Sequence, residues 1–265
     1  MNDFRRDSTF ETGAVSHPGR VRSHNEDSFV ARPDFGLWAV ADGMGGHQNG
    51  AMASATVAAS LSAIGPTTSA ADLLEQLEQG VIAANAALRR KISELDGATM
   101  GSTLAVLLAH GGHFACVWCG DSRVYLVRAG RITQVSRDHT EAQDMIERGL
   151  MTVEEARSWP RRHVITRAIG VHDRPALEID HGELDHGDVF VLCSDGLTDH
   201  VRDEEILQAT TIGGAQAICD ALLALTLQRG ATDNVTVLVV RHERRGAPEK
   251  TRWVPNMRQR RSDAP

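Results

Sequence analysis

The sequence predicts an α+β fold in which helices pack outside antiparallel sheets. Three observations support this class. Short apolar runs alternate with turn residues, which is typical of strands joined by hairpins. Long segments carry apolar residues three or four positions apart, which is typical of helices that lie against a sheet. The 265 residues are 42% hydrophobic and 24% charged, an ordinary composition for a globular protein with a substantial core.

The N-terminal part predicts a hairpin and then a buried helix. Residues 26–33 and 36–42 (EDSFVARP and GLWAVAD) have the composition of strands, and residues 33–36 form a turn-like tetrapeptide between them. Residues 48–64 are rich in alanine and apolar on nearly every side, so we expect a helix that is buried on most of its surface.

Residues 69–95 carry the clearest helical pattern. Ser69 followed by Asp72 resembles the start of a capping box. The apolar residues that step by three or four are Leu74, Leu77, Val81, Ala84, Leu88, Ile92 and Leu95. We therefore expect this helix to lay one apolar stripe against a sheet.

Strand-like runs follow between residues 102 and 135. They are STLAVLLA, FACVWCG, RVYLVRA and RITQV, and turn residues stand at the reversals: Gly111-Gly112, Asp121-Ser122 and Gly130. This order predicts an antiparallel meander.

Residues 138–162 interrupt the strand pattern. They are polar and have weak helical spacing, so we expect an excursion from the sheet. Beyond it the sequence predicts strands at 163–170, 176–184, 188–195 and 234–242, and a helix over 215–225 that closes at Arg229 and Gly230. No repeat or linker divides this region, so we predict one domain from residue 9 to residue 242.

The charge is distributed unevenly along the chain. The net charge is −7, but residues 241–265 contain eight Arg/Lys and three Asp/Glu, a net of +5, so residues 1–240 carry −12. An acidic body argues against a nucleic-acid partner. The basic tail, residues 243–265, lacks apolar periodicity and is predicted to be disordered. It could dock on acidic partners or lipid headgroups, or simply keep the chain soluble.

Hydropathy and cysteine usage favour a cytoplasmic location. No apolar run reaches the roughly 20 residues that a membrane span needs, and the N-terminus lacks a signal-peptide apolar region. The cysteines lie in apolar segments, which suits buried reduced thiols. Cys116 and Cys119 form a C-x-x-C, but a separation of three along a strand puts their sulfurs on opposite faces, and no second pair completes a zinc set.

Aspartates stand at the ends of several apolar runs. Asp42 ends LWAVAD, Asp121 ends ACVWCGD, Asp195 ends VFVLCSD and Asp233 precedes NVTVLVV. Glycine adjoins the first three, and a single Asp-Gly is most often a plain turn. Several such carboxylates at one locus would repel one another, so their convergence makes sense mainly with cations between them. Carboxylate, main-chain and water oxygens are the ligands that hard divalent cations prefer.

The segment RVRSHNEDSF adds Arg22, Glu26 and Asp27 just before a predicted strand. The planar fork of Arg22 suits two oxygens of a phosphate, and Arg22 could equally pair with Asp27. Glu26 and Asp27 could hold metal-bound waters.

With these motifs in this order, the chain resembles the metal-dependent protein phosphatase family, the type 2C (PPM) serine/threonine phosphatases, in its prokaryotic form. The matching stretches are GRVRSHNEDSF, VADGMGGH, GSTLAVLL, GDSRVYLVRAGRITQVSRDHT, VITRAIG, VFVLCSDGLTD and ATDNVTVLVV. They cover nearly all of residues 12–240. The resemblance implies a four-layer α-β-β-α sandwich with two central antiparallel sheets flanked by pairs of helices.

The resemblance also implies a binuclear Mn²⁺ or Mg²⁺ centre. Asp42 would bridge the two ions, with the backbone carbonyl of Gly43, Asp195 and Asp233 as further ligands. Glu26 and Asp27 would act mostly through water. Asp121 matches the position that binds a third, looser ion, sharing Asp195.

Further roles follow from the same resemblance. Arg22 would clamp the phosphate, Asn234 would brace the site beside Asp233, and residues 138–163 match the mobile flap beside the cleft. Eukaryotic members place a histidine, the proposed general acid, after the Asp-Gly pair, where this chain has Met44, as prokaryotic members commonly do. His47 and a metal-bound water are equal candidates for the proton donor.

The implied reaction is hydrolysis of phosphoserine and phosphothreonine in proteins. Two divalent ions lower the pKa of a bridging water from 15.7 towards about 7, so water or hydroxide would attack phosphorus directly. The implied partners are phosphorylated proteins, with a serine/threonine protein kinase and its substrates as the obvious candidates. In the flap, Arg161 and Arg162 could contact the phosphoprotein or be solvated surface charge.

The alternative function is a non-catalytic phosphoprotein-binding regulator on the same fold. Degenerate members of this kind usually lose metal aspartates, whereas Asp42, Asp195 and Asp233 are all present.

Overall fold

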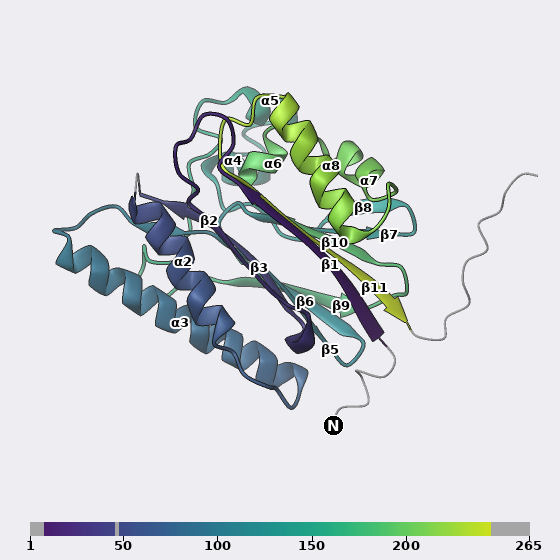
Figure 1. The fold of residues 1–265 in the computed structure, drawn as a ribbon. Helices are drawn as coiled ribbons and strands as arrows, with labels where there is room; N and C mark the ends of the chain where they lie inside the picture. The colour runs from purple at the N-terminus through teal and green to yellow at the C-terminus, as the bar shows by residue number, and fades with distance from the viewer. Residues whose placement is uncertain (1–7, 46–47, 245–265) are drawn as a thin grey trace, which may run out of the picture.

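Two antiparallel β-sheets form the centre of the fold in a computed structural model, which describes residues 8–45 and 48–244 (Figure 1). The first sheet has the order β1 (Ser8–His17), β11 (Val235–Arg244), β10 (Val189–Cys193), β7 (Arg123–Arg128) and β8 (Arg131–Gln134). The second has the order β2 (Asp27–Arg32), β3 (Leu37–Met44), β5 (Leu104–His110), β6 (His113–Cys119) and β9 (Glu178–Glu183), with β4 (Gly101–Ser102) paired to β3.

Helices cover the outer face of each sheet. Helices α2 (Gln48–Ser62) and α3 (Ala70–Glu94) pack on the second sheet, and α6 (Asp195–Thr198), α7 (Asp203–Ala209) and α8 (Ala215–Gln228) pack on the first. The predicted four-layer α+β sandwich is therefore confirmed. Among the described residues, no helix combines the length and hydropathy that a bilayer span requires.

The alternation of side chains along the strands explains the layers. On β3, Leu37, Ala39 and Ala41 face α2 and α3, whereas Trp38 and Val40 face the other sheet. Both faces of this strand are buried, which is why its sequence is an almost continuous apolar run. A third apolar cluster lies between the first sheet and α6, α7 and α8.

Several local predictions hold in detail. Helix α3 begins where the Ser69 hydroxyl accepts a hydrogen bond from the Asp72 N–H. Its predicted stripe is buried at Leu77, Val81, Ala84 and Leu88, half-buried at Leu74 and Ile92, and exposed at Leu95. Cys116 and Cys119 lie on opposite faces of β6, the first between the sheets and the second towards α2 and α3. The four cysteines are buried free thiols. The turn at 33–36 contains one turn of 3-10 helix, η1 (Pro33–Phe35).

The predicted meander over residues 102–135 is wrong as a single unit. Strands β5 and β6 pair in the second sheet, whereas β7 and β8 pair in the first, so the chain crosses between the sheets at residues 120–122. A turn sequence specifies that the chain reverses, but it does not specify which strand pairs with the next one. Here β6 pairs with β9 and β7 pairs with β10.

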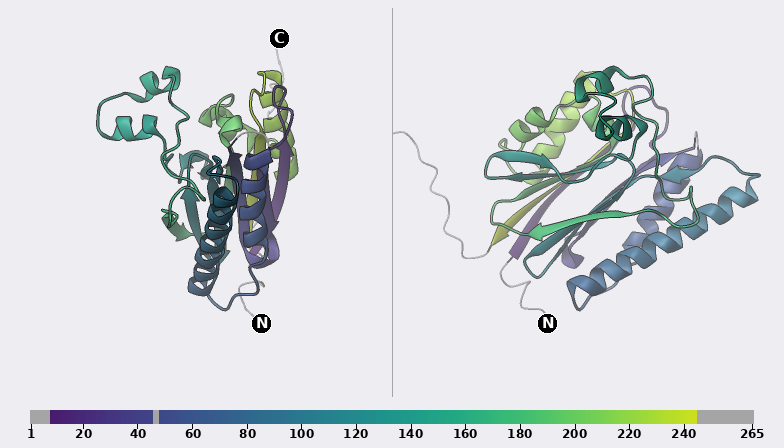
Figure 2. Two further views of the ribbon diagram at one scale, coloured as in Figure 1. Left: turned by 90° about the vertical axis from the view of Figure 1, so that its left-hand side faces the viewer. Right: turned by 180° about the vertical axis from the view of Figure 1, so that it is seen from behind.

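The strand predicted at 163–170 is also wrong. This segment makes only isolated bridges, between Thr140 and Ile165 and between Ser102 and Ile169. Its apolar residues instead anchor the excursion to the body, since Ile169 is fully buried in the core beneath α3. The excursion contains α4 (Glu141–Glu147) and α5 (Val153–Ser158), which stand off the sandwich (Figure 2).

The sequence did not predict β1, α6 or α7. Strand β1 is built largely from small and polar residues, and α6 and α7 are too short to show a helical period. The domain limits 9–242 stay a prediction. Most of the predicted tail, from residue 245 onward, lies outside the described residues, and so does His47.

Candidate metal centre

The predicted aspartates gather at one end of the sandwich. Asp27 on β2 stands directly opposite Asp42 on β3, Asp121 follows β6, Asp195 begins α6 after β10, and Asp233 precedes β11. In antiparallel sheets the end of one strand lies beside the start of its partner, which brings these positions to the same edge. The charges of the other four all act on the Asp42 carboxyl group.

Glycines beside two of these aspartates allow close packing of other backbone segments. A Cβ atom on Gly43 would overlap the carbonyl oxygen of Gly50 at the start of α2, and a Cβ atom on Gly196 would overlap the carbonyl oxygen of Asn234. The glycine after Asp42 therefore lets α2 pack against β3, and the glycine after Asp195 lets α6 pack against the start of β11.

Burial makes ionised carboxylates unfavourable here. It raises the pKa of Asp42 and Asp121 well above the ordinary value, and it raises the pKa of Asp27 to about 7, with the neighbouring carboxylates adding to each shift. Asp27 Oδ1 and Asp121 Oδ1 are buried and have no hydrogen-bond donor. Divalent cations would provide the positive charge that these oxygens lack, so the residues fit a metal centre.

Arg22 lies at the edge of this acidic cluster. Its Nη2 donates to Asp233 Oδ2 at 2.8 Å, and this interaction raises the pKa of the guanidinium. The alternative that Arg22 pairs with Asp27 is wrong, because Asp27 is buried against Ser194 while Arg22 remains about half exposed.

Asn234 ties the segment around Arg22 to the first sheet. Its Nδ2 donates to the carbonyl oxygens of Pro18 and His24, and its Oδ1 accepts from the backbone N–H of Glu26. The Asn234 N–H also donates to Asp233 Oδ1. Through these contacts Asn234 lies beside Asp233 and holds the backbone of Glu26 next to the acidic cluster.

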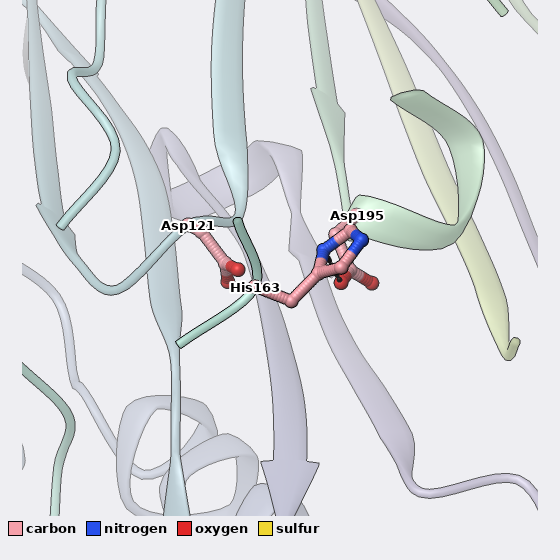
Figure 3. A group of neighbouring side chains, drawn as sticks. All are labelled: Asp121, His163 and Asp195. Atoms are coloured by element: carbon pink, nitrogen blue, oxygen red, sulfur yellow. Dashed lines mark ion pairs between the residues drawn. The ribbon is translucent and has the colours of Figure 1, made fainter. Parts of the chain in front are cut away.

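His163 joins the cluster, although the sequence had indicated it only as the end of the flap and the start of a predicted strand. Ligand atoms of Asp121, His163 and Asp195 lie within 4.8 Å of one another (Figure 3). The His163 Nδ1 is 3.5 Å from Asp195 Oδ2, and its Nε2 is 3.4 Å from Asp199 Oδ2. These carboxylates raise the pKa of His163. No local pattern could have identified it, since the segment reaches the cleft only through the three-dimensional path of the flap.

The flap, residues 138–163, is joined to the body at its root. The guanidinium of Arg123 donates to both oxygens of Asp138, at 2.9 Å from Nε to Oδ1 and 2.6 Å from Nη2 to Oδ2. Of the two predicted arginines, Arg161 forms an ion pair with Glu141 inside the flap, and Arg162 is exposed. The flap is thus attached to the body near the Asp121 turn.

Comparisons with known proteins agree with this geometry. The sequence matches the family described as "Protein phosphatase 2C" over residues 18–232. It is 42% identical over 228 residues to the serine/threonine protein phosphatase PstP of Mycobacterium tuberculosis. The alignment covers 85% of this chain and 44% of PstP. The chain therefore spans less than half the length of that relative.

Solved structures show the same fold. PppA of Pseudomonas aeruginosa, described as a key regulatory component of T6SS, superimposes with a TM-score of 0.83 at 37% identity, covering 89% of this chain and 99% of that one. The catalytic domain of PstP in complex with two manganese ions superimposes with a TM-score of 0.80 at 38% identity, again covering 89% and 99%.

Proposed function

Because the chain belongs to the protein phosphatase 2C family, we propose that it is a metal-dependent protein phosphatase that hydrolyses phosphoserine and phosphothreonine. One observation carries the proposal: buried and half-buried aspartates from both sheets meet at one end of the sandwich, and two of their oxygens are buried without a hydrogen-bond donor. Such a site is costly to a protein unless it binds cations.

In this proposal Asp42, Asp195, Asp233 and the carbonyl of Gly43 would hold two cations, Mn²⁺ or Mg²⁺. Glu26 and Asp27 would act at the same centre mostly through water. When bound, the two cations supply hydroxide near neutral pH by lowering the pKa of water, and they offset the charge of the phosphate.

The remaining groups bind and orient the phosphate. Arg22 is exposed enough to reach a phosphate while its Nη2 keeps contact with Asp233, so its fork is presented at the edge of the cleft. Asn234 holds residues 18–26 in place, so that the fork keeps its direction. A preorganised donor of this kind stabilises charge on the phosphate without reorganising during the reaction.

A third, weaker cation site would use Asp121 and share Asp195. His163 supplies a nitrogen donor from the flap at the same place. The partners of the enzyme would be phosphorylated proteins in the cytoplasm, and a serine/threonine protein kinase with its substrates fits that chemistry. No observation favours a purely phosphoprotein-binding role, because the described cleft retains Asp42, Asp195 and Asp233.

The test is the release of phosphate from a phosphothreonine peptide with and without Mn²⁺. We expect turnover that depends on Mn²⁺ and is lost in Asp195→Asn. Asp180→Asn, an exposed aspartate on β9 far from the cleft residues, is the matched control and should retain turnover. Metal-independent turnover, or full activity of Asp195→Asn, would contradict the proposal.

A further inference from the structure

The carboxylates of the cleft belong to two different sheets. Asp27 and Asp42 lie on the second sheet, Asp195 follows a strand of the first, and Asp121 lies where the chain crosses between them. The distances among these carboxylates therefore depend on how the two sheets are held at this edge. A serine adjoins each of the latter two aspartates, Ser122 after Asp121 and Ser194 before Asp195, and these serines are 1% and 0% exposed.

The Ser194 hydroxyl does not make the hydrogen bond that is usual for its position. It is the N-cap residue of α6, where a serine side chain ordinarily accepts a hydrogen bond from the first turn of the helix. Its hydroxyl makes no such bond. Instead it donates to Asp27 Oδ2 at 2.8 Å and accepts from the Thr236 N–H at 3.0 Å. The hydroxyl thus links the first sheet to a carboxylate of the second.

Ser122 makes a second link through Thr103. The two hydroxyl oxygens are 2.7 Å apart, and the Thr103 hydroxyl accepts from the Asp42 N–H at 2.9 Å. Thr103 stands in the break between β4 and β5, and its own N–H donates to the Asp42 carbonyl at 2.8 Å. The Asp42 N–H therefore donates to the Thr103 hydroxyl, where a strand would ordinarily offer a backbone carbonyl. The same Thr103 hydroxyl also contacts Ser122.

We infer that Ser122 and Ser194 are positioning residues that set the separations among these carboxylates, and thereby the affinity for divalent cations. Ser194 joins the first sheet to Asp27 of the second, and Ser122 joins the crossing segment beside Asp121 to the strand of Asp42. The Ser194 hydroxyl makes its contact in place of a cap on α6, and the Ser122 hydroxyl reaches Asp42 through Thr103. Such contacts are strong in a buried setting, and outer contacts of this kind orient the ligands that bind a metal. The inference rests on the proposed function.

The experiment is a calorimetric titration of the metal-free full chain with Mn²⁺ alone. Ser122→Ala should weaken the cation site that includes Asp121, and Ser194→Ala should weaken the site beside Asp27, each by roughly 10-fold to 100-fold in Kd. Thr103→Val removes the first link from its other side and should reproduce the effect of Ser122→Ala. Thr226→Val is the matched control, because it removes a fully buried hydroxyl that bonds only within α8.

The melting temperature of each metal-free variant separates positioning from loss of structure. Folded variants that bind Mn²⁺ with the affinity of the unmodified chain overturn the inference, as does an equal loss of affinity in Thr226→Val. If one of Ser122→Ala, Ser194→Ala and Thr103→Val does not fold, the Mn²⁺ affinities of the other two test the inference. If the unmodified chain binds Mn²⁺ and turns over substrate, the proposed function stands whatever the serines do. If it binds none, both are overturned.

Discussion

Different forces hold the metal cleft and the flap, although both lie at the same end of the sandwich. The cleft residues lie on paired strands or directly beside their ends, and buried backbone and hydroxyl contacts fix them. The flap stands off the body, exposes Leu150 and Val153, and is held by ion pairs such as the one between Arg137 and Glu147 (Figure 2). Under the proposed function, metal binding falls to residues held by paired strands, and contacts with the substrate fall to the flap.

Replacement of Asp42 by asparagine should have the largest effect, because Asp42 is the residue proposed to contact both cations. We expect turnover of a phosphopeptide to fall by roughly 1000-fold or more, since several kcal/mol of charge stabilisation is lost and each 1.4 kcal/mol is tenfold in rate. Initial rates at saturating Mn²⁺ measure this. Asp180→Asn should stay within about twofold of the unmodified chain, as expected of an exposed substitution away from the cleft.

Asp42→Asn should lose turnover, but without metal it should not lose thermal stability. The folded pKa of Asp42 lies above its unfolded value, so its ionised form destabilises the folded state at neutral pH. The neutral asparagine removes that cost. We therefore expect metal-free Asp42→Asn to melt at or above the melting temperature of the unmodified chain. Mn²⁺ should raise the melting temperature of the unmodified chain but not that of the variant. A metal-free variant that melts well below it would argue against this account.

Replacement of Arg22 tests the edge of the cleft and should have a smaller effect. We expect Arg22→Ala to lower kcat/KM for a phosphopeptide by about 100-fold, a typical cost of removing a preorganised donor. Arg22→Lys should lie between, because lysine retains the charge but not the planar fork. Arg20→Ala, which loses only an exposed bond to the Leu227 carbonyl, is the control. Equal kinetics for Arg22→Ala and Arg20→Ala would remove Arg22 from the phosphate site.

The root of the flap should respond to pH. Burial and nearby Arg167 lower the pKa of His139, outweighing the attraction of Glu178, so the ring is neutral and its Nδ1 accepts from the Gly120 N–H at 3.1 Å. Below about pH 6.5 the unfolded chain binds a proton that the folded ring resists, and stability falls. His139→Asn keeps an acceptor and cannot titrate.

The measurement is the melting temperature of both proteins from pH 7.5 to pH 5.5, without metal. The unmodified chain should lose a few degrees relative to His139→Asn as the pH falls, while the two should differ by a constant amount above pH 7. Parallel curves across the whole range would show that His139 does not titrate on unfolding.

The sequence predicted the cleft better than it predicted the connections around it. Asp42, Asp121 and Asp195 stood out because each follows an apolar run that is largely buried on both faces, and a carboxylate there needs an explanation. Ser122 and Ser194 did not stand out, because a serine beside a turn is ordinary until its partner is known. His163 and the crossing at residues 120–122 depend on contacts between distant segments, which no local period encodes.

The smallest expected effect concerns the outer flap. Arg162 is exposed next to His163, and Arg161 is paired with Glu141, so together they place basic charge beside the cleft. We expect Ala at both positions to reduce kcat/KM for a phosphopeptide by about threefold to tenfold, because exposed ion pairs contribute little each. A small aryl phosphate does not reach the flap and should be hydrolysed at the same rate.

Ala at Arg148 and Arg157, also exposed on the flap, is the matched control. Equal losses for both substrates would show that Arg161 and Arg162 stabilise the flap and do not contact the phosphopeptide. The proposal that the flap contacts the substrate would then be contradicted for these two arginines.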